Sequence, residues 1–129
     1  DDPAEEAVRL YRKHRIFPMH HLTVVRESVL KEHPWVATSL MEAFERAKGL
    51  AMERLYQRPP SLLMFGTQWL ERQRFVFGDD PYRYGIKANA KEIDLLQSYS
   101  LEQGLTERKQ PWEELFAEEV LIAEDKLPD

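Results

Sequence analysis

The stretch between Pro34 and the pair Pro59-Pro60 constrains the fold of this chain more than any other segment. Between these prolines, apolar residues recur about every 3.6 residues, which is the period of an amphipathic helix. Proline fits the start of a helix but stops one that reaches it from the N-terminal side. The pattern therefore predicts one long helix from Trp35 to Pro59. Its apolar positions are Val36, Leu40, Met41, Phe44, Ala47, Leu50, Ala51 and Leu55, and charged residues fill the other face.

Shorter helices are predicted on both sides of this one from capping residues and apolar spacing. Side chains of Asp, Ser, Thr and Asn can accept a hydrogen bond from a free N–H at the start of a helix, and Gly favours the turn that ends it. The predicted helices run from Asp2-Pro3 to His14, from Ser28 to His33, from Thr67 to Gly78, from Asn89 to Gly104 and from Pro111 to Phe116. The acidic residues 121–129 are expected to fray.

One segment, Ile16 to Arg26, predicts a strand because it is rich in β-branched and apolar residues. Pro18 fits only at its entry, since proline cannot donate a backbone hydrogen bond to a sheet. The chain is thus expected to be mostly α-helical with one or two strands. A single strand leaves backbone groups unpaired on both edges, so we expect partner strands from polypeptide outside this chain.

Composition excludes several classes of function. The net charge of 18 − 23 = −5 gives no basic surface for nucleic acid, and the absence of cysteine removes disulfides, thiolate metal sites and a cysteine nucleophile. No apolar run approaches the roughly 18 residues of a membrane helix, and the acidic start is unlike a signal peptide. The chain begins at Asp1 without Met, as a piece cut from a longer protein would.

The residues from Gly78 to Gly85 have the composition of an irregular loop, with aromatic side chains between turn-forming residues. Adjacent acidic residues in the loop, Asp79 and Asp80, favour a turn. A divalent cation site is the alternative, but two adjacent carboxylates supply too few oxygen ligands by themselves.

A set of motifs follows in a fixed order from Ile16 to Phe116. The motifs are the segment from Ile16 to Arg26, His33-Pro34-Trp35-Val36-Ala37, Ser39-Leu40, Ala43-Phe44, Gly78-Asp79-Asp80, Tyr84-Gly85, Asn89, Tyr99-Ser100, Glu102-Gln103-Gly104-Leu105 and Glu113-Glu114-Leu115-Phe116. Taken in this order, they resemble the C-terminal part of the 4,5-dihydroxyphthalate decarboxylase family. The chain departs from the family pattern at Arg83, where the family has Pro, at Ala90, where it has Arg, and at His20, where it is commonly apolar.

The resemblance implies an α/β fold, because members of this family are similar to two-lobed periplasmic solute-binding proteins with a ligand cleft between the lobes. Residues 1–129 would then form a single C-terminal segment of a larger protein, a partial lobe of the type 2 periplasmic-binding-protein kind. The missing N-terminal lobe would be its partner and would supply strands to pair with the segment from Ile16 to Arg26.

The resemblance also implies a catalytic residue, His21. Decarboxylation of an electron-rich ring needs a proton at the ring carbon that loses the carboxylate, and imidazole titrates near neutrality. A histidine that only hydrogen-bonds the backbone is the alternative. Neighbouring residues of a strand point to opposite faces, so His20 and His21 are not expected to share a metal ion. No cofactor is predicted, and the metal requirement stays open.

A dianionic aromatic substrate also needs cations and aromatic contacts. Arg26 and Arg83 are the candidates to bind its carboxylates through paired hydrogen bonds, and Tyr82 and Tyr84 are the candidates to stack on its ring. Solvated arginines, and tyrosines that pack the loop onto the body of the protein, are the alternatives.

Three hypotheses follow for the function. The first is part of a cytoplasmic decarboxylase of phthalate catabolism, inactive as this segment alone, with a small aromatic carboxylate as ligand. The second is a periplasmic, non-catalytic solute-binding protein of the ABC-transporter type. The third concerns assembly, namely a homodimer that covers the exposed strand.

Overall fold

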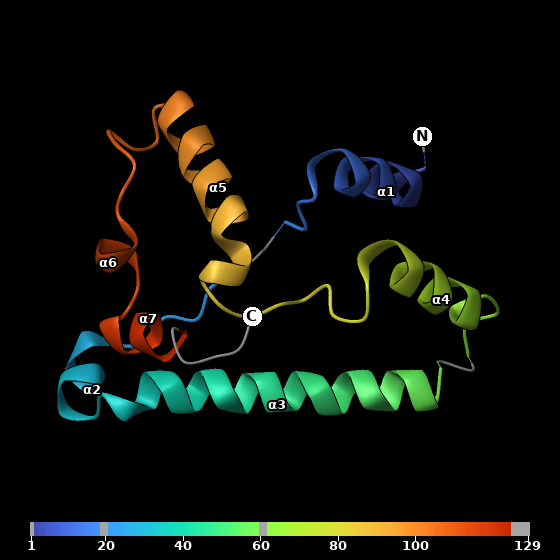
Figure 1. Cartoon of the computed structure of the whole chain (residues 1–129), viewed down its shortest axis with the longest axis horizontal. Helices are drawn as coiled ribbons and strands as arrows, with labels where there is room; N and C mark the ends of the chain where they lie inside the picture. The colour runs from blue at the N-terminus through green and yellow to red at the C-terminus, as the bar shows by residue number, and fades with distance from the viewer. Residues whose placement is uncertain (1, 19–20, 60–61, 125–129) are drawn as a thin grey trace. The chain divides into compact units, whose positions relative to one another are not determined.

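The computed structural model describes residues 2–18, 21–59 and 62–124, and within these ranges the regular structure is entirely helical (Figure 1). The long helix α3 is the largest element, and a short 3₁₀ turn, η1, precedes α5. The elements are α1 (Pro3–His14), α2 (Glu27–Glu32), α3 (Trp35–Gln57), α4 (Gly66–Phe77), η1 (Lys87–Asn89), α5 (Ala90–Glu102), α6 (Trp112–Leu115) and α7 (Glu118–Glu124). None of the described helices is long and apolar enough to cross a membrane.

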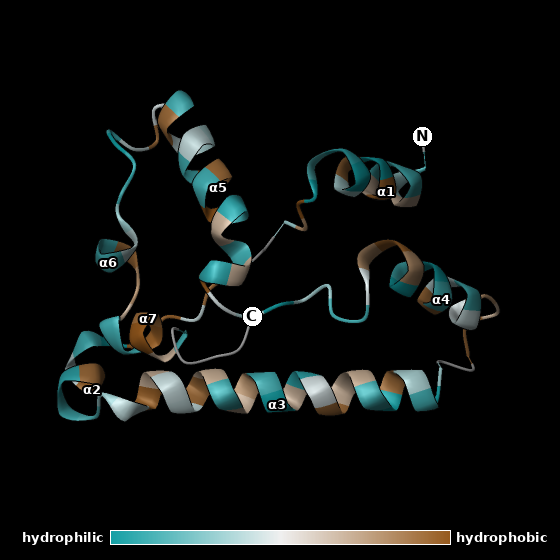
Figure 2. Cartoon of the chain, viewed as in Figure 1, coloured by the Kyte–Doolittle hydropathy of each residue, from teal (hydrophilic) through white to brown (hydrophobic). Residues whose placement is uncertain are grey.

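The two helices with the clearest start signals form as predicted. At the start of α1 the Asp2 carboxylate accepts a hydrogen bond from the Ala4 N–H at 2.8 Å, and Pro3 occupies the first helical position. Helix α3 begins at Trp35 and ends at Gln57, just before Pro59. Figure 2 shows hydrophobic and hydrophilic residues alternating along α3, as its amphipathic sequence predicts.

The predicted caps of α2 and α4 are wrong, although both helices exist. The N-cap positions belong to Arg26 and Phe65, so Ser28 and Thr67 lie inside the helices. Asn89 does occupy the N-cap of α5, but its side-chain amide donates to the Gly85 carbonyl at 2.7 Å. The presence of these helices was therefore easier to predict than the residue at which each begins or the hydrogen bond made there.

The predicted strand is wrong for every part of it that the structure describes. Residues 16–18 and 21–26 have no regular structure, while Met19 and His20 lie outside the described residues. A β-rich composition makes a strand only where a second strand accepts and donates its hydrogen bonds. The described ranges offer no such partner, so Leu22 and Val24 are 64% and 90% exposed. The expectation of an α/β lobe is therefore wrong for the described residues, whose regular structure is entirely helical.

The C-terminal residues also differ from expectation. Residues 121–124, which were expected to fray, form the end of α7, and the side chain of Glu124 is buried. The rest of that expected tail, 125–129, lies outside the described residues.

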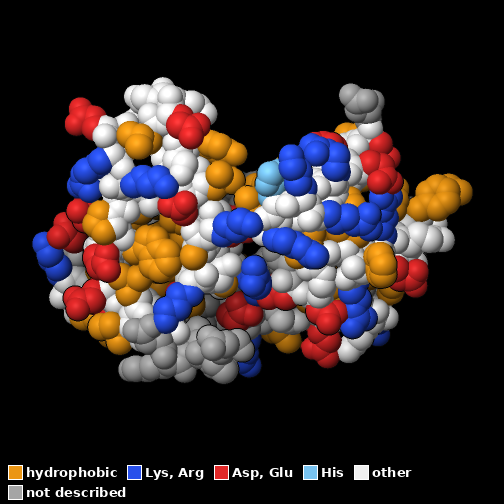
Figure 3. Space-filling model, turned by 45° about the horizontal axis from the view of Figure 1, so that its top comes forward, with side chains coloured by type: hydrophobic (Ala, Val, Ile, Leu, Met, Phe, Trp, Pro, Cys, Tyr) orange, Lys and Arg blue, Asp and Glu red, His pale blue; other side chains and the backbone are white. Residues whose placement is uncertain are grey.

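The chain divides into two compact units. Unit 1 comprises Asp1–Phe17 and Phe44–Arg83, and unit 2 comprises Pro18–Ala43 and Tyr84–Asp129. Unit 1 buries Val8 and Ile16, and unit 2 buries Ala37, Ile86 and Ile93. Both cores are small for the number of apolar residues, and Figure 3 shows hydrophobic side chains at the surface among charged ones.

Candidate functional site

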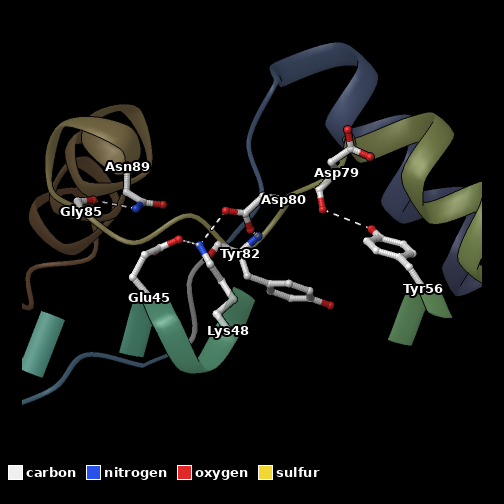
Figure 4. A network of polar contacts seen from close by, with 8 residues as sticks. All are labelled: Glu45, Lys48, Tyr56, Asp79, Asp80, Tyr82, Gly85 and Asn89. Carbon is white, nitrogen blue, oxygen red and sulfur yellow. Dashed lines mark hydrogen bonds and ion pairs between the residues drawn. The ribbon is translucent and has the colours of Figure 1, made fainter. Parts of the chain in front are cut away.

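The loop that follows α4 is held in unit 1 by the ammonium group of Lys48, which projects from α3 (Figure 4). The Lys48 Nζ lies 2.6 Å from Asp80 Oδ2 and 2.9 Å from Glu45 Oε1, and it donates to the Tyr82 carbonyl at 3.2 Å. Its side chain is only 11% exposed. An ammonium is costly to remove from water unless it is paired, and here two carboxylates and a carbonyl replace the lost water.

The charge state of Lys48 follows from these contacts. Burial disfavours the charged form, but the hydrogen bonds and charges of Asp80 and Glu45 outweigh burial and raise the pKa of Lys48 above its usual value of 10.5. Lys48 is therefore an ammonium at neutral pH, and two carboxylates already neutralise it.

A second set of contacts fixes the loop one residue earlier. The Arg74 guanidinium of α4 forms an ion pair with the Asp79 carboxylate, and the Tyr56 hydroxyl of α3 donates to the Asp79 carbonyl at 3.1 Å. Both loop carboxylates are thus engaged by cations of unit 1. Within the described ranges, no group of three or more His, Asp or Glu side chains is placed to hold a metal ion.

Aromatic rings continue from the loop into the core of unit 1. The Tyr82 ring packs edge-on against Phe17, with centroids 5.3 Å apart, and Phe17 contacts Phe77 at 5.5 Å. Tyr11 also packs against Phe77, with centroids 4.8 Å apart. Tyr82 ends this row and remains 51% exposed, so part of its ring is available to a ligand.

In unit 2, a buried carboxylate holds the start of η1. Glu124 is 7% exposed, and its carboxylate accepts hydrogen bonds from the backbone N–H groups of Ile86 and of Lys87, the latter at 3.0 Å. Gly85 lies directly beside it with φ +111°, and a Cβ there would come within 2.8 Å of Glu124 Oε1.

The predicted site residues fall in both units. His21 and Arg26 lie exposed on the irregular segment of unit 2, and Tyr84 of the same unit is 46% exposed. Tyr82 and Arg83 lie exposed in unit 1. Within unit 2, His21 and Arg26 are five residues apart in sequence, on the segment that leads into α2. The roles assigned to these five residues stay predictions.

Sequence reasoning missed Lys48 and Glu124 as residues that shape the loop. Lys48 fits the polar face of a long helix, and Glu124 fits an acidic tail, so neither pattern marks a special position. The loop residues that they bind are 32 and 38 residues away in sequence. A pattern of neighbouring residues does not predict contacts over such a separation.

Comparison with known proteins gives a distant relationship to an enzyme. No protein-family model matches the chain. A curated protein of Comamonas testosteroni, 4,5-dihydroxyphthalate decarboxylase, is 31% identical over 118 residues, which is 90% of this chain. The chain spans 36% of that protein's length, about a third. This finding supports a distant relationship to a decarboxylase.

Proposed function

We propose that this chain is part of a decarboxylase that removes a carboxylate, without oxidation, from an aromatic dicarboxylate such as 4,5-dihydroxyphthalate. The observation that carries the proposal is the similarity to a protein of that name, which extends over 118 of the 129 residues. The order of motifs from Ile16 to Phe116 supports the same assignment.

The proposed reaction breaks the bond between a ring carbon and its carboxylate. The electron pair of that bond stays on the ring carbon, carbon dioxide leaves, and a proton is added to the same carbon. The hydroxyl para to the departing carboxylate donates electron density to the ring. We assign the proton to His21, because its imidazole is exposed and because imidazole can hold or release a proton near neutrality.

Binding of the substrate is assigned to charged and aromatic side chains. Arg26 and Arg83 are exposed guanidinium groups that match the paired oxygens of a carboxylate. Tyr82 and Tyr84 each keep about half of their surface exposed and can stack on the substrate ring. This scheme uses proton transfer alone and no cofactor.

Activity is proposed for a longer polypeptide than these 129 residues. The chain spans about a third of the similar decarboxylase, so the remaining two thirds of that protein has no counterpart here. We expect the isolated segment to be inactive and its partner to be the rest of the same polypeptide. An enzyme of aromatic catabolism is placed in the cytoplasm under this proposal.

Turnover by the complete product of the gene tests the proposal. We expect release of carbon dioxide and formation of 3,4-dihydroxybenzoate from 4,5-dihydroxyphthalate. His21→Gln, which keeps the side-chain size and removes the titrating group, should lower kcat by about 10²–10⁴-fold. The matched control is His33→Gln, an exposed histidine of the same unit that the scheme does not use.

Two results would contradict different parts of the proposal. Tight binding of the dicarboxylate without turnover would favour the non-catalytic, periplasmic solute-binding alternative. Turnover that is equal in the wild type and in His21→Gln would leave the decarboxylase in place and remove the role of His21.

A further inference from the structure

Lys48 is one of the charged side chains that contact the loop and that the decarboxylation scheme leaves unused. It lies on α3, 32 residues before its partner Asp80, and its side chain is 11% exposed. The partners described above, Asp80, Glu45 and Tyr82, lie in unit 1, as do Lys48 and Arg83.

Lys48 and Asp80 together fix the backbone of Tyr82 at both of its polar groups. Asp80 Oδ1 accepts the Tyr82 N–H at 3.1 Å, while Asp80 Oδ2 accepts from Lys48 Nζ at 2.6 Å. The same Nζ donates to the Tyr82 carbonyl at 3.2 Å. Because the N–H and the carbonyl are both held, the direction in which the Tyr82 side chain leaves the loop is determined.

The ring of Tyr82 is also held in place, by contact with another aromatic ring. It meets Phe17 edge-on, with an interplanar angle of 87° and centroids 5.3 Å apart. Figure 4 shows the ring directed away from the Lys48 ammonium. The Tyr82 ring is supported on one side and the residue is 51% exposed, so the ring is prepared to stack on a ligand at a small cost in conformational entropy.

Charge decides whether Lys48 itself binds the ligand. Its ammonium lies between two carboxylates, so the local sum of Lys48, Glu45 and Asp80 is −1. An anionic substrate gains nothing from a cation that is neutralised in this way, and it is repelled by the second carboxylate. Lys48 therefore suits a role in holding the loop and not one in contacting the substrate.

We propose that Lys48 is a positioning residue for substrate recognition, which fixes the Asp80–Tyr82 turn so that the Tyr82 ring receives the aromatic ring of the dicarboxylate. The inference rests on the proposed function, in which Tyr82 contacts the substrate. In this role Lys48 increases the affinity for the substrate, and other groups carry out the proton transfer.

Substitution of Lys48 in the complete gene product separates affinity from chemistry. Lys48→Met should raise the Kd and KM for 4,5-dihydroxyphthalate by about tenfold and leave kcat within about twofold, because the lost interaction acts on binding. Lys48→Arg keeps a cation and its donors and should restore most of the affinity. The control is Lys109→Met, which breaks a Lys109–Asp94 ion pair of 2.7 Å in unit 2 and should change neither constant.

A second readout reports on the loop without using activity. Amide hydrogen exchange at Tyr82 should be faster in Lys48→Met than in the wild type and in Lys48→Arg, because Asp80 loses the cation that holds it. If Lys48→Met does not fold, Asp80→Asn provides the same comparison, since it weakens the bond to Nζ and keeps the side-chain volume.

The outcomes distinguish this inference from the function on which it rests. Wild-type protein that does not bind the dicarboxylate overturns both. Wild-type protein that binds it without turnover overturns the decarboxylase, and the Kd of Lys48→Met still decides the role of Lys48. Faster exchange at Tyr82 with an unchanged Kd shows a structural contact only and overturns the inference, as does an unchanged exchange rate.

Discussion

At the scale of single residues, the loop between α4 and α5 is shaped by two charges of opposite sign, one half-buried (Lys48) and one buried (Glu124). Lys48 holds its first part within unit 1, and the carboxylate of Glu124 holds its last part within unit 2. In the sequence, Arg83 and Tyr84 lie between these two parts of the loop, and both are assigned to substrate binding. Each anchor makes two hydrogen bonds to the loop, and a charge removed from water that loses its partners is strongly destabilising.

Gly85 is the residue at which the Glu124 anchor is most sensitive to substitution. Gly85→Ala should lower the free energy of unfolding by about 1–3 kcal/mol, because φ +111° is strained for a residue with a Cβ. The new Cβ would also lie 2.8 Å from a carboxylate oxygen that two backbone N–H groups hold in place. Denaturant unfolding measures the change.

The matched control for that substitution is Gly49→Ala in α3. Apart from the adjacent residues and the backbone of α3 itself, no described atom lies within 4 Å of a Cβ at that position, so alanine should stabilise the helix by about 0.5–1 kcal/mol. Equal effects of the two substitutions would contradict the close approach of Glu124 to Gly85.

The titration of Lys48 provides a prediction about pH. Because Asp80 and Glu45 raise its folded-state pKa above 10.5, its ion pairs contribute stability that is fully present below that value. The contribution is lost as the pH rises through the higher folded-state pKa. NMR titration of ¹³C-labelled lysine side chains should give Lys48 a midpoint above 10.5, and Asp80→Asn should lower it. A midpoint that Asp80→Asn leaves unchanged would mean that the ion pair does not form in solution.

At the scale of elements, local signals predicted α1 to α6 but not α7, and contacts between distant residues decided the structure of the loop. The period of apolar residues predicted α3, and Asp2 with Pro3 predicted the start of α1. Each of these signals lies within or directly beside the helix that it predicts. The segment from Ile16 to Arg26 has the composition of a strand, but a strand also needs a partner. The loop was expected from its turn-forming residues, whereas its anchors come from helices 32 and 38 residues away.

The start of α1 provides the prediction at this scale. Asp2→Ala removes the acceptor of the Ala4 N–H and should cost the helix about 0.5–2 kcal/mol, whereas Asp2→Asn keeps an acceptor and should cost much less. Backbone chemical shifts of α1 measure the helical population in each variant. A helix that is equally populated in the two variants would show that Pro3 and the following residues suffice.

At the scale of the whole molecule, the described residues bury little apolar surface for a chain of this length. Five hydrophobic residues are buried in the described ranges, whereas Leu62, Met64 and Val24 are each about nine-tenths exposed or more. Exposed apolar side chains in such numbers are typical of surfaces that other polypeptide covers. This agrees with the proposal that activity needs more than a third of the length of the similar decarboxylase.

The most direct test of the account is the release of carbon dioxide from 4,5-dihydroxyphthalate by the complete gene product, measured beside the isolated 129 residues. We predict one carbon dioxide and one 3,4-dihydroxybenzoate for each substrate molecule consumed by the complete product, and no release by the isolated segment. A complete product that folds but releases no carbon dioxide from this substrate would contradict the proposed function.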